Sequence, residues 1–130
     1  MDCIFCKIAQ NKLQSVKIYE DKEHLAILDA HPNTEGQALV ITKKHYTSYP
    51  FDIPDNVYSK ILLVAKKLGK ILDKTFSSRT CLVIEGFQID HIHIKLYPVK
   101  KDEPLKTFVG HPVNKEELEK IANKIKKNFK

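Results

Sequence analysis

An alternating segment in the last third of the chain most constrains how it can fold. Three nitrogen-bearing side chains alternate there with three apolar ones: His91, Ile92, His93, Ile94, Lys95 and Leu96. Because successive side chains of a β-strand point to opposite faces, the pattern predicts a strand with one face toward a core and one polar face. We expect this strand to run from His91 to Tyr97 and to end at Pro98.

Four further short strands are expected elsewhere in the chain. Alternation, β-branched residues and bounding turns place them at residues 16–19, 25–28, 38–42 and 80–85. One long helix separates the third from the fourth, because apolar residues recur with a period near 3.6 from Pro54 to Lys74. Shorter helices are expected around Ile4 and at about residues 114–129. Strands joined by short turns and interrupted by one long helix favour an α+β fold with a five-stranded antiparallel sheet.

The composition fits one domain that spans residues 1–130. The 42% of hydrophobic and 29% of charged residues are ordinary for a globular protein, and no apolar run approaches the roughly 20 residues of a membrane span. The N-terminus lacks the apolar stretch of a secretory signal, so we expect a cytoplasmic protein. The net charge of +6 comes largely from lysines of the last helix. Their spacing fits a solvated helix face rather than a nucleic-acid surface, although a positive field would help to gather phosphorylated substrates.

The polar face of the His91–Tyr97 segment carries groups suited to chemistry on phosphates. Imidazole acts as a nucleophile or base near neutral pH, and lysine supplies a fixed positive charge for phosphate oxygens. A half-exposed strand with polar residues facing water is the alternative, and it would suffice for a lone histidine. Two histidines two residues apart, followed by a lysine, favour a site. Three other histidines, His24, His31 and His111, stand singly among polar residues and are expected at the surface.

The same segment resembles the signature of the histidine-triad (HIT) family, His-φ-His-φ-His-φ-φ, in which φ is apolar. Three other stretches are similar to the family: Cys3–Ile8 to its opening, Val16–Asp29 to its first hairpin, and Gly36–His45 to its Gly-His-x-Leu-Val-Ile-Pro-Lys-x-His segment. Together they cover about residues 3–98, the motif-bearing part of the chain. The resemblance implies the family's fold, a homodimer, and a purine nucleotide or nucleoside phosphoramidate as substrate.

The resemblance also implies roles for single residues. His93, the middle histidine, matches the nucleophile that attacks the α-phosphorus and forms a nucleotidyl-histidine intermediate. Asp29 matches the carboxylate that holds the ribose hydroxyls, and Gln88 stands where the family places a small polar residue near the phosphate. The remaining positions of the nucleotide-binding set are Ile4, Phe5, Ile8 and Ile27 around the base, together with Gln37.

Two cysteines near the N-terminus suggest a metal site. In a reducing compartment a pair such as Cys3 and Cys6 is more often half of a metal site or a redox pair than a structural disulfide. By the family resemblance, His45 and His91 match the other two ligands of a Cys₂His₂ zinc centre. This set is tetrahedral and leaves no position for water, so the zinc would be structural and would fasten the N-terminal helix to the sheet. A redox or simply buried pair is the alternative, and Cys81 is expected to be an inert buried thiol.

Three residues depart from the family pattern. Lys95 occupies the place of the third histidine, Gln37 replaces the histidine after the glycine, and Thr42 replaces the usual proline. An ammonium group stabilises charge but neither accepts a hydrogen bond nor titrates easily at pH 7, so proton transfer to a leaving group should be weak. We therefore expect phosphoramidates or activated adenylates to be preferred over simple esters.

The leading hypothesis from the sequence is an enzyme. It would be a nucleotidyl hydrolase or transferase that acts on an α-phosphate through His93, with Lys95 and Gln88 beside it. The first alternative is a zinc-stabilised nucleotide-binding protein with weak or no catalysis, which Lys95 and Gln37 favour. The second is a dinucleoside polyphosphate hydrolase or phosphorylase, which shares the nucleophile but needs room for a second nucleotide.

Overall fold

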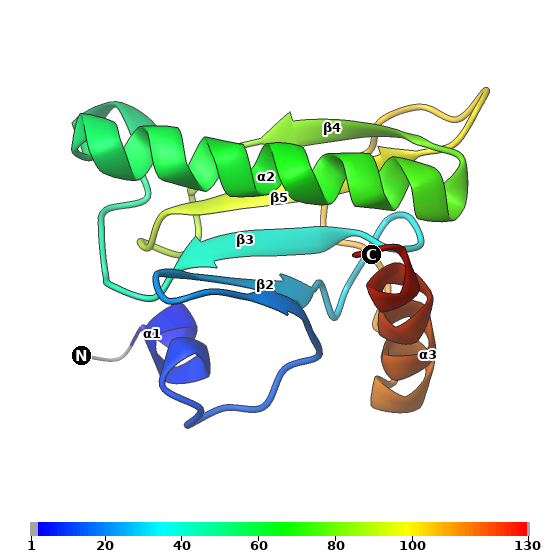
Figure 1. The fold of residues 1–130 in the computed structure, drawn as a ribbon, viewed down its shortest axis with the longest axis horizontal. Coiled ribbons are helices and arrows are strands. Elements are labelled where there is room, and N and C mark those ends of the chain that lie inside the picture. The colour runs from blue at the N-terminus through cyan, green and yellow to red at the C-terminus, as the bar shows by residue number, and fades with distance from the viewer. Residues whose placement is uncertain (1–2, 130) are drawn as a thin grey trace.

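A computed structural model describes residues 3–129, and its centre is a five-stranded antiparallel sheet (Figure 1). The strands are β1 (Lys17–Glu20), β2 (His24–Leu28), β3 (Ala38–Thr42), β4 (Arg79–Val83) and β5 (His93–Val99). Their order across the sheet is β1-β2-β3-β5-β4, so β5 lies between β3 and β4. The predicted α+β fold is confirmed. The ends of the predicted domain, residues 1–2 and 130, lie outside the described residues.

Three helices pack around the sheet, as predicted. They are α1 (Ile4–Ala9), α2 (Asp55–Phe76) and α3 (Lys115–Lys126), with 3-10 turns at Pro50–Asp52 and Lys127–Phe129. The long helix α2 runs along one face of the sheet, whereas the short helix α1 lies beside β2 and β3 (Figure 1). Between residues 3 and 129, no helix has the length and apolar character needed to cross a membrane.

Alternation along the strands divides the apolar side chains between the two faces of the sheet. Ala26 and Leu28 of β2 belong to the core formed with α2 and α3, whereas Leu25 and Ile27 pack with Phe5 and the rest of α1. His93 and Lys95 share this second face, because they pair with Ile41 and Leu39 of β3. This face is covered by a helix of only six residues, which leaves room for a site beside it.

The strand that carries the histidines begins later than predicted. β5 starts at His93 rather than at His91. The backbone before it pairs with a loop instead of a strand, since the amide of Ile92 donates to the carbonyl oxygen of Tyr46 at 3.0 Å. His91 is therefore a fully buried loop residue and not part of a polar strand face.

The same strand also ends later than predicted. It passes through Pro98 to Val99, whereas β4 is shorter than expected and stops at Val83. The proline is tolerated because the pairing of β5 with β3 reaches only to Leu96, so one side of β5 has no neighbouring strand at Pro98. Proline is expected to end a strand that is paired on both sides, but it can occur where the strand has a neighbour on one side only.

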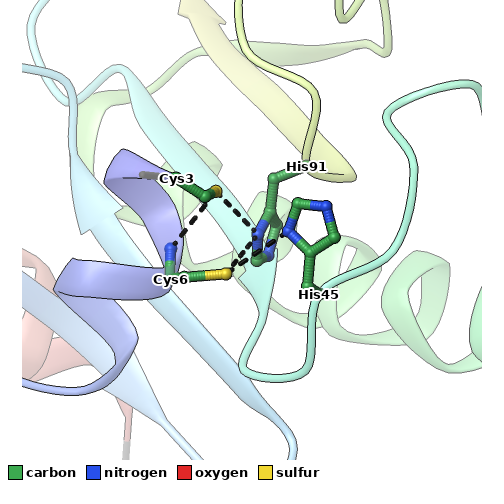
Figure 2. A group of neighbouring side chains, drawn as sticks. All are labelled: Cys3, Cys6, His45 and His91. Carbon is green, nitrogen blue, oxygen red and sulfur yellow. Dashed lines mark hydrogen bonds between the residues drawn. The ribbon is translucent and has the colours of Figure 1, made fainter. Parts of the chain in front are cut away.

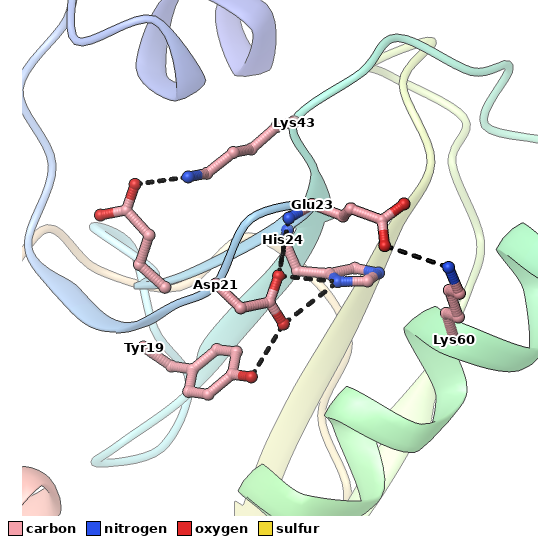
Figure 3. Close-up of polar contacts among 7 residues, drawn as sticks. Tyr19, Asp21, Glu23, His24, Lys43 and Lys60 are labelled. Carbon is pink, nitrogen blue, oxygen red and sulfur yellow. Dashed lines mark hydrogen bonds and ion pairs between the residues drawn. The ribbon is translucent and has the colours of Figure 1, made fainter.

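A polar network around the buried His24 ties the hairpin between β1 and β2 (Figure 3), and the expectation of an exposed His24 was wrong. His24 is only 5% exposed. Oδ1 of Asp21 accepts the amide hydrogen of His24 at 2.7 Å and lies 3.1 Å from its ring Nδ1. Oδ2 accepts the hydroxyl hydrogen of Tyr19 at 2.8 Å. Burial acts to raise the pKa of Asp21, but the hydrogen bonds from Tyr19, Glu23 and His24 lower it overall.

We expect Asp21→Ala to lower the free energy of unfolding by about 2 kcal/mol at pH 7, because it leaves the buried ring of His24 and the half-buried hydroxyl of Tyr19 without a partner. The pKa of Asp21 is lower in the folded chain than its ordinary value. Its contribution is therefore complete above the unfolded pKa and is lost as the pH falls through the folded pKa. Urea denaturation at pH 7 and below pH 3 measures both effects.

The exposed Asp52 in the 3-10 turn provides the control, since Asp52→Asn should change stability by less than about 0.5 kcal/mol. A stability difference between wild type and Asp21→Ala that stays constant into the acid range would contradict this account of the hairpin.

Candidate active site and metal centre

Four side chains from distant parts of the sequence meet at one end of the sheet (Figure 2). Cys3 and Cys6 come from the start of α1, His45 from the loop after β3, and His91 from the loop before β5, and their ligand atoms all lie within 4.8 Å of one another. Nδ1 of His91 is 3.4 Å from Sγ of Cys3 and 3.5 Å from Sγ of Cys6. Nδ1 of His45 is 3.3 Å from Sγ of Cys6. Sulfur and nitrogen ligands of tetrahedral zinc are roughly 3.5 Å apart, given bonds of about 2.3 and 2.0 Å, so the spacing fits zinc.

The ring of His91 is oriented for metal binding. Its Nε2 lies 2.7 Å from the carbonyl oxygen of Thr42, which can only accept, so Nε2 carries the hydrogen. Nδ1 therefore keeps its lone pair toward the two cysteines. Zinc-binding histidines commonly donate their other N–H to a carbonyl in this way. Burial lowers the pKa of His91, which favours the neutral ring that binds metal.

His93 lies at the start of β5 and is only 3% exposed. Its Nδ1 is 2.7 Å from the carbonyl oxygen of His91, so Nδ1 donates and Nε2 holds the lone pair. The ring of Phe5 packs against it edge-on with 4.9 Å between centroids. Burial, assisted by the positive charge of Lys95, lowers the pKa of His93. The result is a neutral imidazole whose orientation is fixed by the backbone.

A cavity of about 660 Å³ opens on the same side of the sheet. Eight residues proposed from the sequence line it: Ile4, Phe5, Ile8, Ile27, Asp29, Gln37, Gln88 and Lys95. Its volume falls in the range of pockets for small molecules, and apolar side chains make up much of its wall. His93 is not part of the cavity wall, but its ring packs against Phe5, which is a wall residue.

The carboxylate of Asp29 is held from two sides at the edge of this cavity. Oδ1 accepts the amide hydrogen of His31 at 2.9 Å, and Oδ2 accepts a hydrogen from the side-chain amide of Gln37 at 2.9 Å. The oxygen of that amide accepts from the backbone N–H of Asn33 at 2.7 Å. Gln37 thus lines the cavity, but both polar atoms of its side chain are already hydrogen-bonded, and one of these bonds orients Asp29.

Sequence reasoning missed one charged residue at the site. Glu85 follows the end of β4, and its Oε1 lies 3.1 Å from Nζ of Lys95. Nothing in the alternating pattern of the histidine segment pointed to it. The register of β4 against β5, which pairs Val83 with Lys95, would have been needed to see that Glu85 reaches this site.

Sequence reasoning also missed the C-terminal part of the cavity wall. The lining residues from this part are Thr107, Phe108, Val109, Val113, Lys115 and Leu118. Backbone hydrogen bonds tie the segment to the loop after β2, from the amide of Gly110 to the carbonyl of His31 at 3.1 Å and from Val113 to Ala30 at 3.0 Å. These tertiary pairings leave no periodic signal in the sequence.

The expectation that Cys81 is a buried thiol was also wrong, since Cys81 is half-buried.

Known proteins are similar to this chain in sequence and in fold. The family description that matches the chain is the HIT domain, over residues 10–102. The chain belongs to the HIT family. This HIT protein is 36% identical over 122 residues to the adenosine 5′-monophosphoramidase HNT1 of Saccharomyces cerevisiae, a match that covers 92% of this chain and 76% of the yeast protein.

Solved structures of HIT proteins have the same fold. A hypothetical histidine triad nucleotide-binding protein from Sulfolobus tokodaii superimposes with a TM-score of 0.86 at 26% identity, covering 97% of this chain and 91% of the other. A zinc-bound histidine triad family protein from Mycobacterium smegmatis gives a TM-score of 0.81 at 25% identity, covering 98% and 93% of the two chains. The family resemblance predicted from the sequence is confirmed.

Proposed function

We propose that this HIT protein is a hydrolase or transferase of nucleoside phosphoramidates and related adenylates, with His93 as its nucleophile. The orientation of the His93 ring carries the proposal: Nδ1 is bound to the carbonyl oxygen of His91 at 2.7 Å, so Nε2 is the unprotonated nitrogen. A neutral, oriented imidazole is the form that attacks phosphorus. The activity named for the yeast relative supports the same class of reaction.

The reaction proceeds in two displacements. In the first, Nε2 of His93 forms a bond to the α-phosphorus while the bond from phosphorus to the leaving amine breaks. The electron pair of the broken bond goes to the amine, which takes up a proton from water. In the second, water attacks the same phosphorus, the bond to Nε2 breaks, and the nucleotide leaves with one proton released. One water is consumed for each amine and nucleotide formed.

The cavity provides a seat for the nucleoside. The base lies among Ile4, Phe5, Ile8 and Ile27, and the oriented carboxylate of Asp29 accepts hydrogens from the ribose hydroxyls. Lys95 and Gln88, on the cavity wall, contact the phosphate. An apolar slot with few polar groups at one end accommodates a flat purine. It discriminates little between one purine and another, because few of its groups can form hydrogen bonds with the edges of the base.

Zinc is the cofactor proposed for Cys3, Cys6, His45 and His91. Two thiolates and two imidazoles with the spacing described fill a tetrahedral shell, so the ion supplies stability rather than a reactive water. It would anchor α1 and with it Phe5, a residue of the cavity wall. A cytoplasmic location is proposed on the same ground, since a reducing compartment keeps both thiols available as ligands.

Comparison of leaving groups tests the proposed reaction. We expect kcat/KM for adenosine 5′-phosphoramidate to exceed that for the methyl ester of AMP at least 100-fold, because the phosphoramidate nitrogen is basic enough to take its proton from water, whereas the ester oxygen needs a positioned acid, a role that Lys95 fills poorly. Release of AMP, followed by chromatography, measures both rates. Equal rates would contradict the role given to Lys95. Tight nucleotide binding without turnover of either substrate would instead favour the alternative of a binding protein.

A homodimer is proposed across the free edge of β4. This strand pairs only with β5, and its Leu82 is 47% exposed. Leu63 of α2 is 63% exposed, which adds apolar surface on the helix. We expect sedimentation equilibrium to give a dimer mass for the wild type and a monomer mass for Leu82→Asp. Leu105→Asp, at another exposed leucine, should remain dimeric, and a monomeric wild type would contradict the proposal.

A further inference from the structure

Lys95 does not stand alone at the position where the family has its third histidine. It lies two residues after His93 on β5 and lines the cavity. Its Nζ is 3.1 Å from Oε1 of Glu85, and the two side chains are 23% and 28% exposed. Oε2 of Glu85 accepts the amide hydrogen of Phe87 at 3.4 Å. The carboxylate therefore binds the ammonium with one oxygen and its own loop with the other.

The position of Glu85 follows from the pairing of the two strands. Val83 is the last residue of β4 and pairs with Lys95. Glu85 comes two residues later, beyond the end of the strand, and its contact with Lys95 places its carboxylate on the face that carries His93 and Lys95. Partial burial acts to raise the pKa of Glu85, but its hydrogen bond to Lys95 and the lysine charge lower it overall. Glu85 is thus charged at neutral pH.

We propose that Glu85 is a positioning residue of the active site, which holds the Lys95 ammonium beside the reacting phosphate, so that the pair replaces the third histidine. This inference rests on the proposed function. A lysine ammonium has three N–H donors, and Glu85 occupies one, which leaves two for phosphate oxygens. Without Glu85, the four-carbon stem of Lys95 is free to move toward solvent, since a flexible side chain keeps its geometry only when something holds it.

The pair also selects substrates by charge. The ammonium attracts the single negative charge of a phosphoramidate, whereas the nearby carboxylate repels a leaving group that carries several charges. A phosphoramidate or adenylate therefore fits better than a dinucleoside polyphosphate, whose leaving group is an anionic chain of phosphates. Glu85 therefore favours the nucleotidyl hydrolase or transferase over the dinucleoside polyphosphate hydrolase among the three hypotheses from the sequence.

The test compares Glu85→Gln, Glu85→Asp, Lys95→Met and the double variant Glu85→Gln/Lys95→Met. Glu23→Gln is the matched control, because Glu23 also lies 3.1 Å from a lysine, Lys60, but on the hairpin shown in Figure 3. The substrates are adenosine 5′-phosphoramidate and diadenosine tetraphosphate. Isothermal titration with AMP and adenosine adds a measurement that does not need turnover.

We expect Glu85→Gln to lower kcat/KM for the phosphoramidate about tenfold, with a smaller loss for Glu85→Asp and none for Glu23→Gln. Glu85→Gln should also weaken AMP binding while adenosine binding stays unchanged, and the preference for phosphoramidate over tetraphosphate should fall about tenfold. In the Lys95→Met background, Glu85→Gln should have no further effect, because Glu85 acts through Lys95.

The inference is overturned if Glu85→Gln behaves like Glu23→Gln, if its effect adds fully to that of Lys95→Met, or if the substrate preference does not change. These outcomes are independent of the proposed function. If His93 is not the nucleophile, turnover will be unchanged in His93→Ala. The comparison of AMP binding with adenosine binding still tests the role of Glu85 in that case.

Discussion

His93→Ala is expected to lower kcat for adenosine 5′-phosphoramidate at least a thousandfold, or about 4 kcal/mol of transition-state stabilisation. The variant removes the imidazole of β5 whose Nδ1 donates to the carbonyl oxygen of His91, which leaves Nε2 with the lone pair. Direct attack by water would then have to replace two easier displacements. A quenched assay of AMP release measures the loss.

Two controls separate chemistry from folding in this experiment. AMP affinity should change by less than about threefold, because the nucleoside seat formed by Asp29 and the apolar wall remains. His111→Ala, at an exposed histidine outside the cavity wall, should retain wild-type turnover. If His93→Ala keeps more than a tenth of wild-type activity, the histidine is not the nucleophile.

Removal of zinc is expected to have the largest effect on stability. The purified protein should contain one zinc ion per chain, and Cys6→Ser should lose it, with a fall of about 4 kcal/mol in the free energy of unfolding and roughly 15 °C in Tm. The reason is that α1 has only six residues, too few to be stable alone. Cys3 provides its N-cap and would also be one of the ligands.

Elemental analysis and thermal denaturation with and without a chelator measure these effects. Cys81→Ser removes a thiol outside the metal cluster and should keep full zinc content and nearly full stability. A wild-type protein without zinc, whose Tm ignores both chelator and added zinc, would contradict the metal hypothesis and leave the cysteines as a redox or buried pair.

Local patterns in the sequence were enough to predict the sheet and the three helices, whereas the family resemblance supplied most of the candidate site residues. The alternation around His93 gave β5, and a period of 3.6 gave α2, because each pattern reports directly on which face is buried. The metal-ligand set came from the family resemblance. The structure then brought Cys3, Cys6, His45 and His91 together, a meeting that spacing alone could not have shown.

The errors arose where tertiary contacts override a local rule. His24 looked solvated because its neighbours are polar, yet those neighbours, above all Asp21, are what allow it to be buried. Pro98 looked like a strand end, but the strand was already unpaired on one side there. Glu85 and the C-terminal wall reach the site through strand register and backbone pairing, which no single segment encodes.

Trapping of the covalent nucleotidyl-histidine intermediate offers the most direct test of the central claim. The protein is mixed with adenosine 5′-phosphoramidate, quenched within milliseconds into denaturant at alkaline pH, where a phosphorus–nitrogen bond to histidine survives, and digested for mass spectrometry. The account predicts that the peptide containing His93 gains the mass of one AMP residue, absent from His93→Ala. Turnover at the wild-type rate with that peptide unmodified, or with AMP attached at another residue, would contradict it.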